Sequence, residues 1–537
     1  GSPATTVYVK PVLGQLETGS YTFTATAILT NGCAVSQDIT IENKSSIWKG
    51  IVDNNWNNKN NWSSAVVPTA NSCVIIPNTV NTSNIIGTNF NGYGKSLIVK
   101  NGGKLDVQSN NTLTITDGVT VEATGTFNLE NAASLIQVNN VANSGIISMK
   151  RNVNVRKLDY VYWSSPVANF PVNSISTTVY RYKWTPTVGT NLNGWGTWVV
   201  ANENMVNGKG YIVRGPDSYT STPQNYTQNF VGVPNNGNIN MPISRGIYDG
   251  PIYNTGVSTT QASNNDDNWN LIGNPYPSAI SANTFLAANT NIAGFIKFWT
   301  HSTLPSAVTS DPFYNNYGQN YTVSDYVNYN ATGANPPVGN GNIGAGQGFF
   351  VLMNHSSAGV NENVVFNNSM RRNDYRNDLF YRNGNITNTD TEEKHRVWLN
   401  LISPSSKSST ALIGYIANAT NDIDRMYDAP AVDVKTNFEL YSFSNTNKLN
   451  IQGKALPFNN DDRISLGISI AQEGTHTIGI SMVDGLFENA SQNIYLEDLT
   501  LGITHDLRVS PYFFTSAVGR FENRFVLKFS NETLGNE

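Results

Sequence analysis

The chain has 537 residues, a length that predicts three or four domains at about 150 residues each. Its 33 Lys and Arg against 38 Asp and Glu give a net charge of −5, which argues against partners such as nucleic acid or an anionic membrane surface. Only 13% of the residues are charged, whereas 78 are asparagine and 11% are aromatic. Because disordered chains are poor in aromatic residues, this composition indicates a folded protein with real cores.

Residues 1–43 predict the end of an immunoglobulin-like repeat. Apolar residues alternate with polar ones along residues 21–29, and a second alternating run covers residues 35–41. Between them, Asn31-Gly32 has the composition of a tight hairpin turn. We therefore expect a β-hairpin that closes a sandwich.

Residues 47–150 combine a Trp-rich segment with the clearest repeat in the chain. Apolar residues recur there at a strict spacing of eight: Leu97, Leu105, Leu113, Val121 and Leu129. Asn, Asp and Gly turns separate them, so each strand is too short to bury its apolar face alone. This pattern favours stacked turns of a β-solenoid over an antiparallel meander.

Five tryptophans are candidate ligand-binding residues: Trp48, Trp56 and Trp62 in the Trp-rich segment, and Trp195 and Trp198 further along. Exposed aromatic rings with a polar tip stack well on sugars, so these side chains predict contact with a glycan. The alternative is that they pack in the core, which is the commoner place for tryptophan in a small β-module.

Residues 151–390 predict an aromatic β-rich module, and residues 391–537 predict a C-terminal β-sandwich. In the first of these, candidate strands are 159–163, 179–184, 198–200, 211–214, 269–272, 295–299 and 349–353, and residues 281–289 predict a short helix. In the second, apolar alternation recurs every 10 to 15 residues with no helical segment between the runs, roughly as in a sandwich.

Asp422, Asp424 and Asp428 form a candidate calcium site, because Ca²⁺ takes its oxygen ligands from loops of this kind. The segment is no EF-hand, since it lacks the central Gly and the terminal Glu. The alternative is an acidic turn that pairs with Arg425. No cofactor is required by any other pattern in the chain.

Other patterns exclude several kinds of site. The five His are widely scattered along the chain, and even the closest two, His476 and His505, lie much further apart than any zinc-binding spacing allows. Cys33 and Cys73 form no C-x-x-C pair and fall in different predicted modules, which leaves a disulfide between them open. No run of apolar residues is long enough for a membrane span, and no signal peptide is recognisable near Gly1.

Catalytic patterns are equally scarce. There is no G-x-S-x-G sequence, and no acidic residue stands among apolar neighbours in a way that predicts a raised pKa. We therefore predict that the chain is not an enzyme. A pair of carboxylates in a glycan-sized cleft, roughly 5–10 Å apart, would instead indicate a glycosidase.

Several phrases together resemble large surface and secreted proteins of the Bacteroidetes that are exported by the type IX secretion system. These phrases are Trp163–Val167, Gly208–Val213, Asn270–Ile280, Gly346–Val351, Ile423–Ala429, Tyr495–Asp498 and Arg524–Phe529. Their order and spacing match that family over roughly residues 47–535. The Asn-Pro-Tyr-Pro-Ser phrase and the Gly-Gln-Gly-Phe-Phe-Val phrase are specific in combination.

The resemblance implies a role and a location. It implies a cell-surface adhesin, displayed outside the outer membrane or secreted, which meets the type IX translocon during export. In that family a sorting domain follows a strand like Arg524–Phe529, and this chain stops at Glu537 where such a domain would begin. Two readings remain: the signal lies outside this sequence, or it is cleaved on export. The resemblance implies no catalytic residue.

Three functional hypotheses follow. The first is the stalk and presentation region of an adhesin, with contact to a polysaccharide or another surface. The second is a secreted polysaccharide-degrading enzyme or its carbohydrate-binding accessory module. The third is a module that the export translocon recognises.

Overall fold

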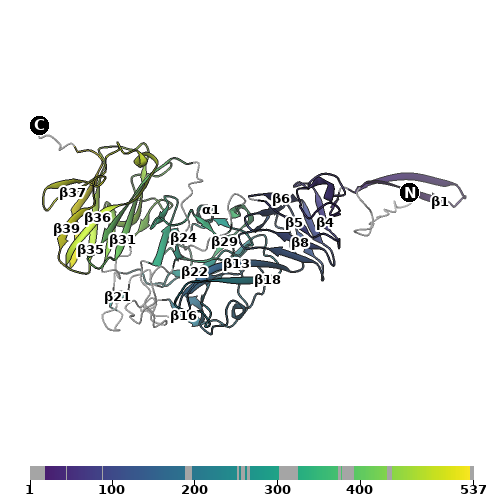
Figure 1. The fold of residues 1–537 in the computed structure, drawn as a ribbon, viewed down its shortest axis with the longest axis horizontal. Helices are drawn as coiled ribbons and strands as arrows, with labels where there is room; N and C mark the ends of the chain where they lie inside the picture. Colours follow the sequence, from purple (N-terminus) through teal and green to yellow (C-terminus); the bar gives the residue numbers. More distant parts are fainter. Residues whose placement is uncertain are drawn as a thin grey trace.

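The computed structural model describes residues 19–28, 30–43, 45–87, 89–187, 196–250, 253–254, 261–262, 267–300, 325–372, 377, 392–431 and 438–531. These residues are built almost wholly of β-strands, with one α-helix among them, α1 (Ala282–Ala288). The sheets follow one another along an elongated molecule (Figure 1). The prediction of an all-β chain made of several modules in series is confirmed.

A two-stranded hairpin projects from one end of the molecule (Figure 1). Its strands, β1 (Gly19–Ile28) and β2 (Ala34–Asn43), pair antiparallel with Phe23 opposite Ile39. The two faces of the hairpin differ in polarity: Phe23 and Ile39 belong to one face, and on the other the Thr24 hydroxyl donates to the Asp38 carboxylate at 2.7 Å. The predicted hairpin is confirmed, and its assignment to an immunoglobulin-like repeat stays a prediction.

A short parallel β-solenoid follows, so the predicted solenoid is confirmed over the alternative meander. Its strands are β3 (Ser46–Ile47), β4 (Cys73–Ile76), β5 (Ser83–Ile85), β6 (Asn91–Gly94), β7 (Ser96–Val99), β8 (Lys104–Val107), β9 (Thr112–Ile115), β10 (Val119–Val121), β11 (Thr126–Leu129) and β12 (Ser134–Gln137). They form three sheets, in which β4, β7 and β10 stack in parallel, as do β5, β8 and β11, and β6, β9 and β12.

The length of one solenoid turn is fixed by the strand register. Leu97 pairs with Val119, Leu105 with Phe127 and Leu113 with Leu135, so the offset between these paired strands is 22 residues in all three sheets. All six side chains are buried in the solenoid interior. Outside, polar side chains bond between adjacent turns at that same offset, as Asn128 does to Asp106, 22 positions earlier, at 2.7 Å.

Strand β13 (Ile147–Val155) joins the solenoid to the aromatic module. It pairs in parallel with β11 on one side and antiparallel with β18 (Gln224–Gly232) on the other. One hydrophobic core therefore extends from the solenoid to Phe230 and Ala345. The predicted boundary between residues 150 and 151 falls inside this strand, so the two predicted modules share a sheet.

The described part of the aromatic module contains two antiparallel sheets and smaller pairs. One sheet has the order β14 (Tyr160–Trp163), β17 (Tyr211–Arg214), β15 (Arg181–Thr185), β16 (Thr197–Val200), and the other has the order β22 (Trp269–Gly273), β28 (Gly348–Met353), β24 (Ile292–Trp299), β25 (Tyr326–Tyr329), β26 (Ala334–Asn335). The pairs are β19 (Ile239–Ser244) with β29 (Asn361–Phe366), β20 (Tyr253–Asn254) with β21 (Gln261–Ala262), and β23 (Ile280–Ser281) with β27 (Asn342–Ile343). Each predicted strand in this module overlaps an observed one, and α1 matches the predicted helix.

In the C-terminal module, the residues that the structure describes form a single sheet of 11 strands. Its strands are β30 (Lys394–Ile402), β31 (Ser408–Ile416), β32 (Ala429–Pro430), β33 (Glu439–Ser444), β34 (Asn447–Ala455), β35 (Arg463–Ile470), β36 (Gly474–Asp484), β37 (Tyr495–Asp498), β38 (Ile503–Asp506), β39 (Tyr512–Ser516) and β40 (Gly519–Lys528). All pairs are antiparallel except β31 with β34.

This sheet curls until its two ends nearly meet, where a sandwich of two sheets was expected. The Tyr512 hydroxyl on β39 donates to Asp498 on β37 at 3.0 Å, and Arg524 on β40 bonds both Asp498 and the backbone oxygen of Thr515. Asp498 is fully buried at this seam. The curvature encloses one apolar core instead of a layer between two sheets.

Candidate functional site

The three tryptophans of the first segment lie in the solenoid core. Trp48, Trp56 and Trp62 are at most 2% exposed, and the ring of Trp62 meets the other two edge to face at 5.0 and 4.7 Å. The backbone amide of Trp56 donates to the backbone oxygen of Asn84 next to the first turn. These rings close the open end of the solenoid, as terminal caps of stacked repeats do.

The predicted glycan platform is therefore wrong for these three residues, because their rings present no exposed face to a sugar. Trp198 is also buried, at 6% exposure, and packs edge to face on Trp184 at 4.9 Å. Trp195 lies outside the residues that the structure describes. A polar, Asn-rich sequence around a tryptophan says little about its exposure, because here Asn side chains such as Asn61 bond the backbone of the cap.

The three candidate calcium ligands do not converge on a point, and two of them bind backbone amides instead. The Asp424 carboxylate accepts from the amide of Thr420, and the Asp428 carboxylate accepts from the amides of Asp424 at 2.6 Å and Gly453 at 2.9 Å. Asp422 is exposed. Among the described residues, no three His, Cys, Asp or Glu side chains group closely enough to hold a metal ion, so this predicted site is wrong.

These carboxylates shape the loop between β31 and β32. Burial raises the pKa of Asp428 to about 6, against the opposing effect of its two amide donors. Asp428 is 6% exposed and ties the loop to β34 through Gly453. Asp424 and Asp428 thus hold the loop in the conformation that presents Arg425, which lies between Asp424 and Met426.

Arg425 extends from this loop into the aromatic module. Its guanidinium donates to the backbone oxygens of Ile292 at 2.9 Å, Leu286 at 3.0 Å and Asn289 at 2.6 Å. Two of these oxygens belong to the C-terminal end of α1, where a cation is favourable. Burial lowers the pKa of Arg425, although its ordinary value is high enough for the side chain to stay charged at neutral pH.

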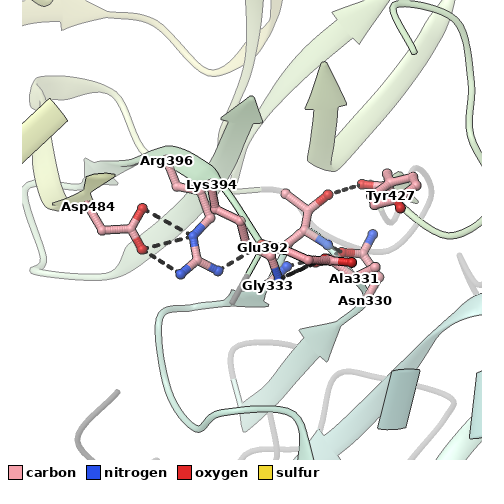
Figure 2. A network of polar contacts seen from close by, with 9 residues as sticks. Asn330, Ala331, Gly333, Glu392, Lys394, Arg396, Tyr427 and Asp484 are labelled. Atoms are coloured by element: carbon pink, nitrogen blue, oxygen red, sulfur yellow. Dashed lines mark hydrogen bonds and ion pairs between the residues drawn. The ribbon is translucent and has the colours of Figure 1, made fainter. Parts of the chain in front are cut away.

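A second set of contacts crosses the same junction from β30 (Figure 2). Arg396 binds both oxygens of Asp484 on β36 and also donates to the backbone oxygen of Thr332 at 2.8 Å. Lys394 donates to the backbone oxygen of Ala331 at 3.1 Å. The side chain of Thr332 in turn donates to the backbone oxygen of Tyr427 at 2.6 Å.

An apolar cluster lies beside these polar contacts. It contains Phe295 and Leu352 of the aromatic module and Trp398, Leu412, Ala429 and Ile451 of the C-terminal sheet. Trp398 is fully buried and its indole N–H donates to the backbone oxygen of Ala334 at 2.8 Å. The junction is thus packed like a domain interior, which disfavours independent motion of the two modules.

The junction between the solenoid and the aromatic module is organised around one buried arginine. Arg371 donates to the backbone oxygen of Leu135 at 2.6 Å, to Ser278 at 3.1 Å and to Asn236 at 3.0 Å. Its guanidinium lies 4.8 Å from the ring centre of Tyr276. These contacts bind the last solenoid turn to the Asn-Pro-Tyr-Pro-Ser phrase, since the Leu135 amide also donates to the backbone oxygen of Pro277.

The sequence does not reveal which residues meet at either junction. Arg371 lies in a charged run at residues 370–382, whose composition is typical of a boundary between modules, and nothing in the sequence sets Arg396 apart. At Arg396 the signal is weak: Lys394 and Arg396 share one face of β30 with the fully buried Trp398, so two cations lie on the same face as a buried apolar side chain. Only the long-range pairing reveals what those cations meet.

Two further findings concern cysteines and membranes. Cys33 and Cys73 are both free and exposed. No helix in the described residues is long and apolar enough to cross a membrane.

Residues 47–529 match the family described as Domain of unknown function (DUF8693). The chain belongs to this family. No curated protein matches the chain, and no solved structure matches it. The match covers the solenoid, the aromatic module and the C-terminal sheet together.

Proposed function

We propose that this chain is the stalk and presentation region of a large cell-surface adhesin, exported by the type IX secretion system and displayed outside the outer membrane. The observation that carries the proposal is the pair of buried junctions. They join the solenoid, the aromatic module and the C-terminal sheet into one elongated body (Figure 1). A stiff body of this kind holds a binding head away from the cell surface.

Two other features support the same role. The charged fraction is only 13%, and polar contacts between the solenoid turns come mainly from Asn, Thr and Ser side chains. Many copies on one cell would convert weak single contacts into firm attachment. Trp48, Trp56, Trp62 and Trp198 are buried, so contact with a polysaccharide or another surface is left to the binding head that this region presents.

The experiment is a replacement in the native protein. In the bacterium that encodes the chain, residues 45–531 are exchanged for a flexible Gly/Ser linker, and surface labelling and attachment are both measured. We expect surface labelling to persist and attachment to fall. Loss of surface labelling would instead favour a module that the translocon recognises, and unchanged attachment with normal labelling would refute the stalk.

A binding assay separates the stalk from a binding head. The purified chain is passed over polysaccharides, including chitin and cellulose, and over cell-surface material, with and without EDTA. The proposal expects no saturable retention by this region alone. Saturable retention would assign the ligand contact to this region, and release of soluble sugar would favour the polysaccharide-degrading enzyme.

A further inference from the structure

Three asparagines from two modules meet at the junction beside Trp398. Asn328 of β25 and Asn335 of β26 form a directly opposed cross-strand pair, and Asn450 comes from β34 of the C-terminal sheet. Asn328 and Asn335 are 8% and 1% exposed. We refer to these three residues as the Asn cluster.

All three amide nitrogens of the Asn cluster donate to protein oxygens. The nitrogens of Asn328 and Asn335 both point at the side-chain oxygen of Asn450, at 2.9 and 2.8 Å. Asn335 also donates to the backbone oxygen of Thr410 at 2.7 Å, and Asn450 donates to that same oxygen at 3.1 Å. Each nitrogen therefore faces an acceptor that the C-terminal sheet supplies.

This arrangement determines which way the amides point. Rotating Asn328 would bring its oxygen against the Asn450 oxygen, and rotating Asn335 would bring its oxygen against three acceptors at once. The side-chain oxygens of Asn328 and Asn335 are consequently the two atoms left over. Both are buried, and neither has a hydrogen-bond partner among the described residues.

We propose that one buried water molecule binds here and donates one hydrogen to the Asn328 oxygen and the other to the Asn335 oxygen. A buried acceptor without a donor costs on the order of 1–3 kcal/mol, and a water satisfies two acceptors at once. A cation fits less well. The Asn cluster is neutral, so the charge of a buried cation would stay uncompensated there. Ca²⁺ would also need about six to eight oxygen ligands.

The site belongs to the junction and not to either module. The aromatic module supplies both acceptors, and the C-terminal sheet supplies Asn450 and Thr410, which orient them. The water would be held only while the two modules are docked. This inference is independent of the proposed adhesin function.

The test is a crystal structure of the whole chain at a resolution that shows ordered solvent. We expect one density peak roughly 2.7–3.0 Å from both oxygens. Three outcomes would overturn the assignment: no peak, rotated amides whose oxygens bond the protein, or a peak at roughly 2.3–2.6 Å from six or more oxygens, which is a cation.

Two variants extend the test. Asn328→Leu removes one acceptor, so the peak should be lost from its crystal structure. Thr410→Val is the matched control, because it alters a neighbouring side chain and keeps the backbone oxygen that orients Asn335, so the peak should remain. A peak that persists unchanged in Asn328→Leu would show that other groups hold the molecule.

Discussion

The solenoid and the C-terminal sheet bury similar β-strands in opposite ways. In the solenoid each strand meets its counterpart in the next turn, in parallel and at an offset that changes little along the chain. In the C-terminal sheet β30 lies between β31 and β36, and its residue Arg396 pairs with Asp484, which is distant in sequence. The first fold is a stack of nearly equivalent units, whereas in the second every strand has a unique place.

Deleting strands should separate the two regions most sharply. Removal of residues 97–118 takes out one solenoid turn, and the strands on either side can stack in the same register, so we expect a folded chain. Removal of β34 leaves β31 and β33 without their shared neighbour, so the C-terminal sheet should unfold. Circular dichroism and thermal melting show whether each deletion variant is folded. The control is deletion of half a turn, residues 97–107, which should unfold the solenoid.

The next largest effect is expected at Arg396 and Asp484. Both are nearly buried, so Asp484→Ala leaves a buried guanidinium without its anion and should cost about 3–5 kcal/mol of unfolding free energy. Urea denaturation of the C-terminal sheet measures it. The control Glu393→Ala removes an exposed carboxylate next to His395 and should change little. Equal effects for the two variants would contradict the assigned role.

A core substitution in the solenoid should cost about 2–5 kcal/mol. Leu113→Ala removes a fully buried side chain from β9, between two other turns. Thr114→Ala, on the outer face of the same strand, is the control and should cost far less, since it loses only a hydrogen bond to Asn91. Thermal melting compares the two, and a smaller loss at Leu113 would contradict the solenoid packing.

The loop that carries Arg425 should respond to pH through Asp428. Its pKa in the folded chain is about 6, above the ordinary value of an Asp, so the folded state binds the proton more tightly. Protonation of Asp428 therefore stabilises the folded state by on the order of 3 kcal/mol. This stabilisation is fully present below about pH 4 and is lost as the pH rises through 6. The unfolding free energy, measured from pH 4 to 7, should fall more steeply for the native chain than for Asp428→Asn. Parallel pH dependences of the unfolding free energy for the two chains would refute the role of Asp428.

The smallest effect is expected on the solenoid surface. Lys100 and Glu122 form a salt bridge of 2.8 Å between adjacent turns, and both remain partly exposed. Glu122→Gln should change the unfolding free energy by about 0–1 kcal/mol, and less at high salt. Denaturation at two salt concentrations tests this. A larger loss would mean that the turns depend on surface charges more than on their apolar interior.

The contrast also explains what could be predicted from the sequence. The spacing of eight revealed the solenoid, because its contacts repeat along the chain. Three steps of eight overshoot one turn slightly, and Val121 therefore stands two places beyond Val119, the true partner of Leu97. This difference of two residues does not change which side chains are predicted to be buried, because alternate residues of a strand share a face.

The C-terminal strands were recognisable, but their order was not. Alternation along β30 or β35 marks a strand and its apolar face, and it carries no information about which strand lies next to it. The metal and glycan candidates failed for a related reason. Asp428 and Trp56 have the residue types that ligand sites use, but backbone amides and neighbouring rings within the fold already occupy them.

The repeated turn has a consequence for the length of the molecule. Stacked strands are separated by roughly 4.8 Å, so each additional turn would lengthen the body by that increment. The Trp-lined cap and the Arg371 contacts lie at the two ends of the stack, so neither would be altered by turns inserted between them. Insertion of whole turns would therefore lengthen the body in small, equal steps while both ends keep the same attachments.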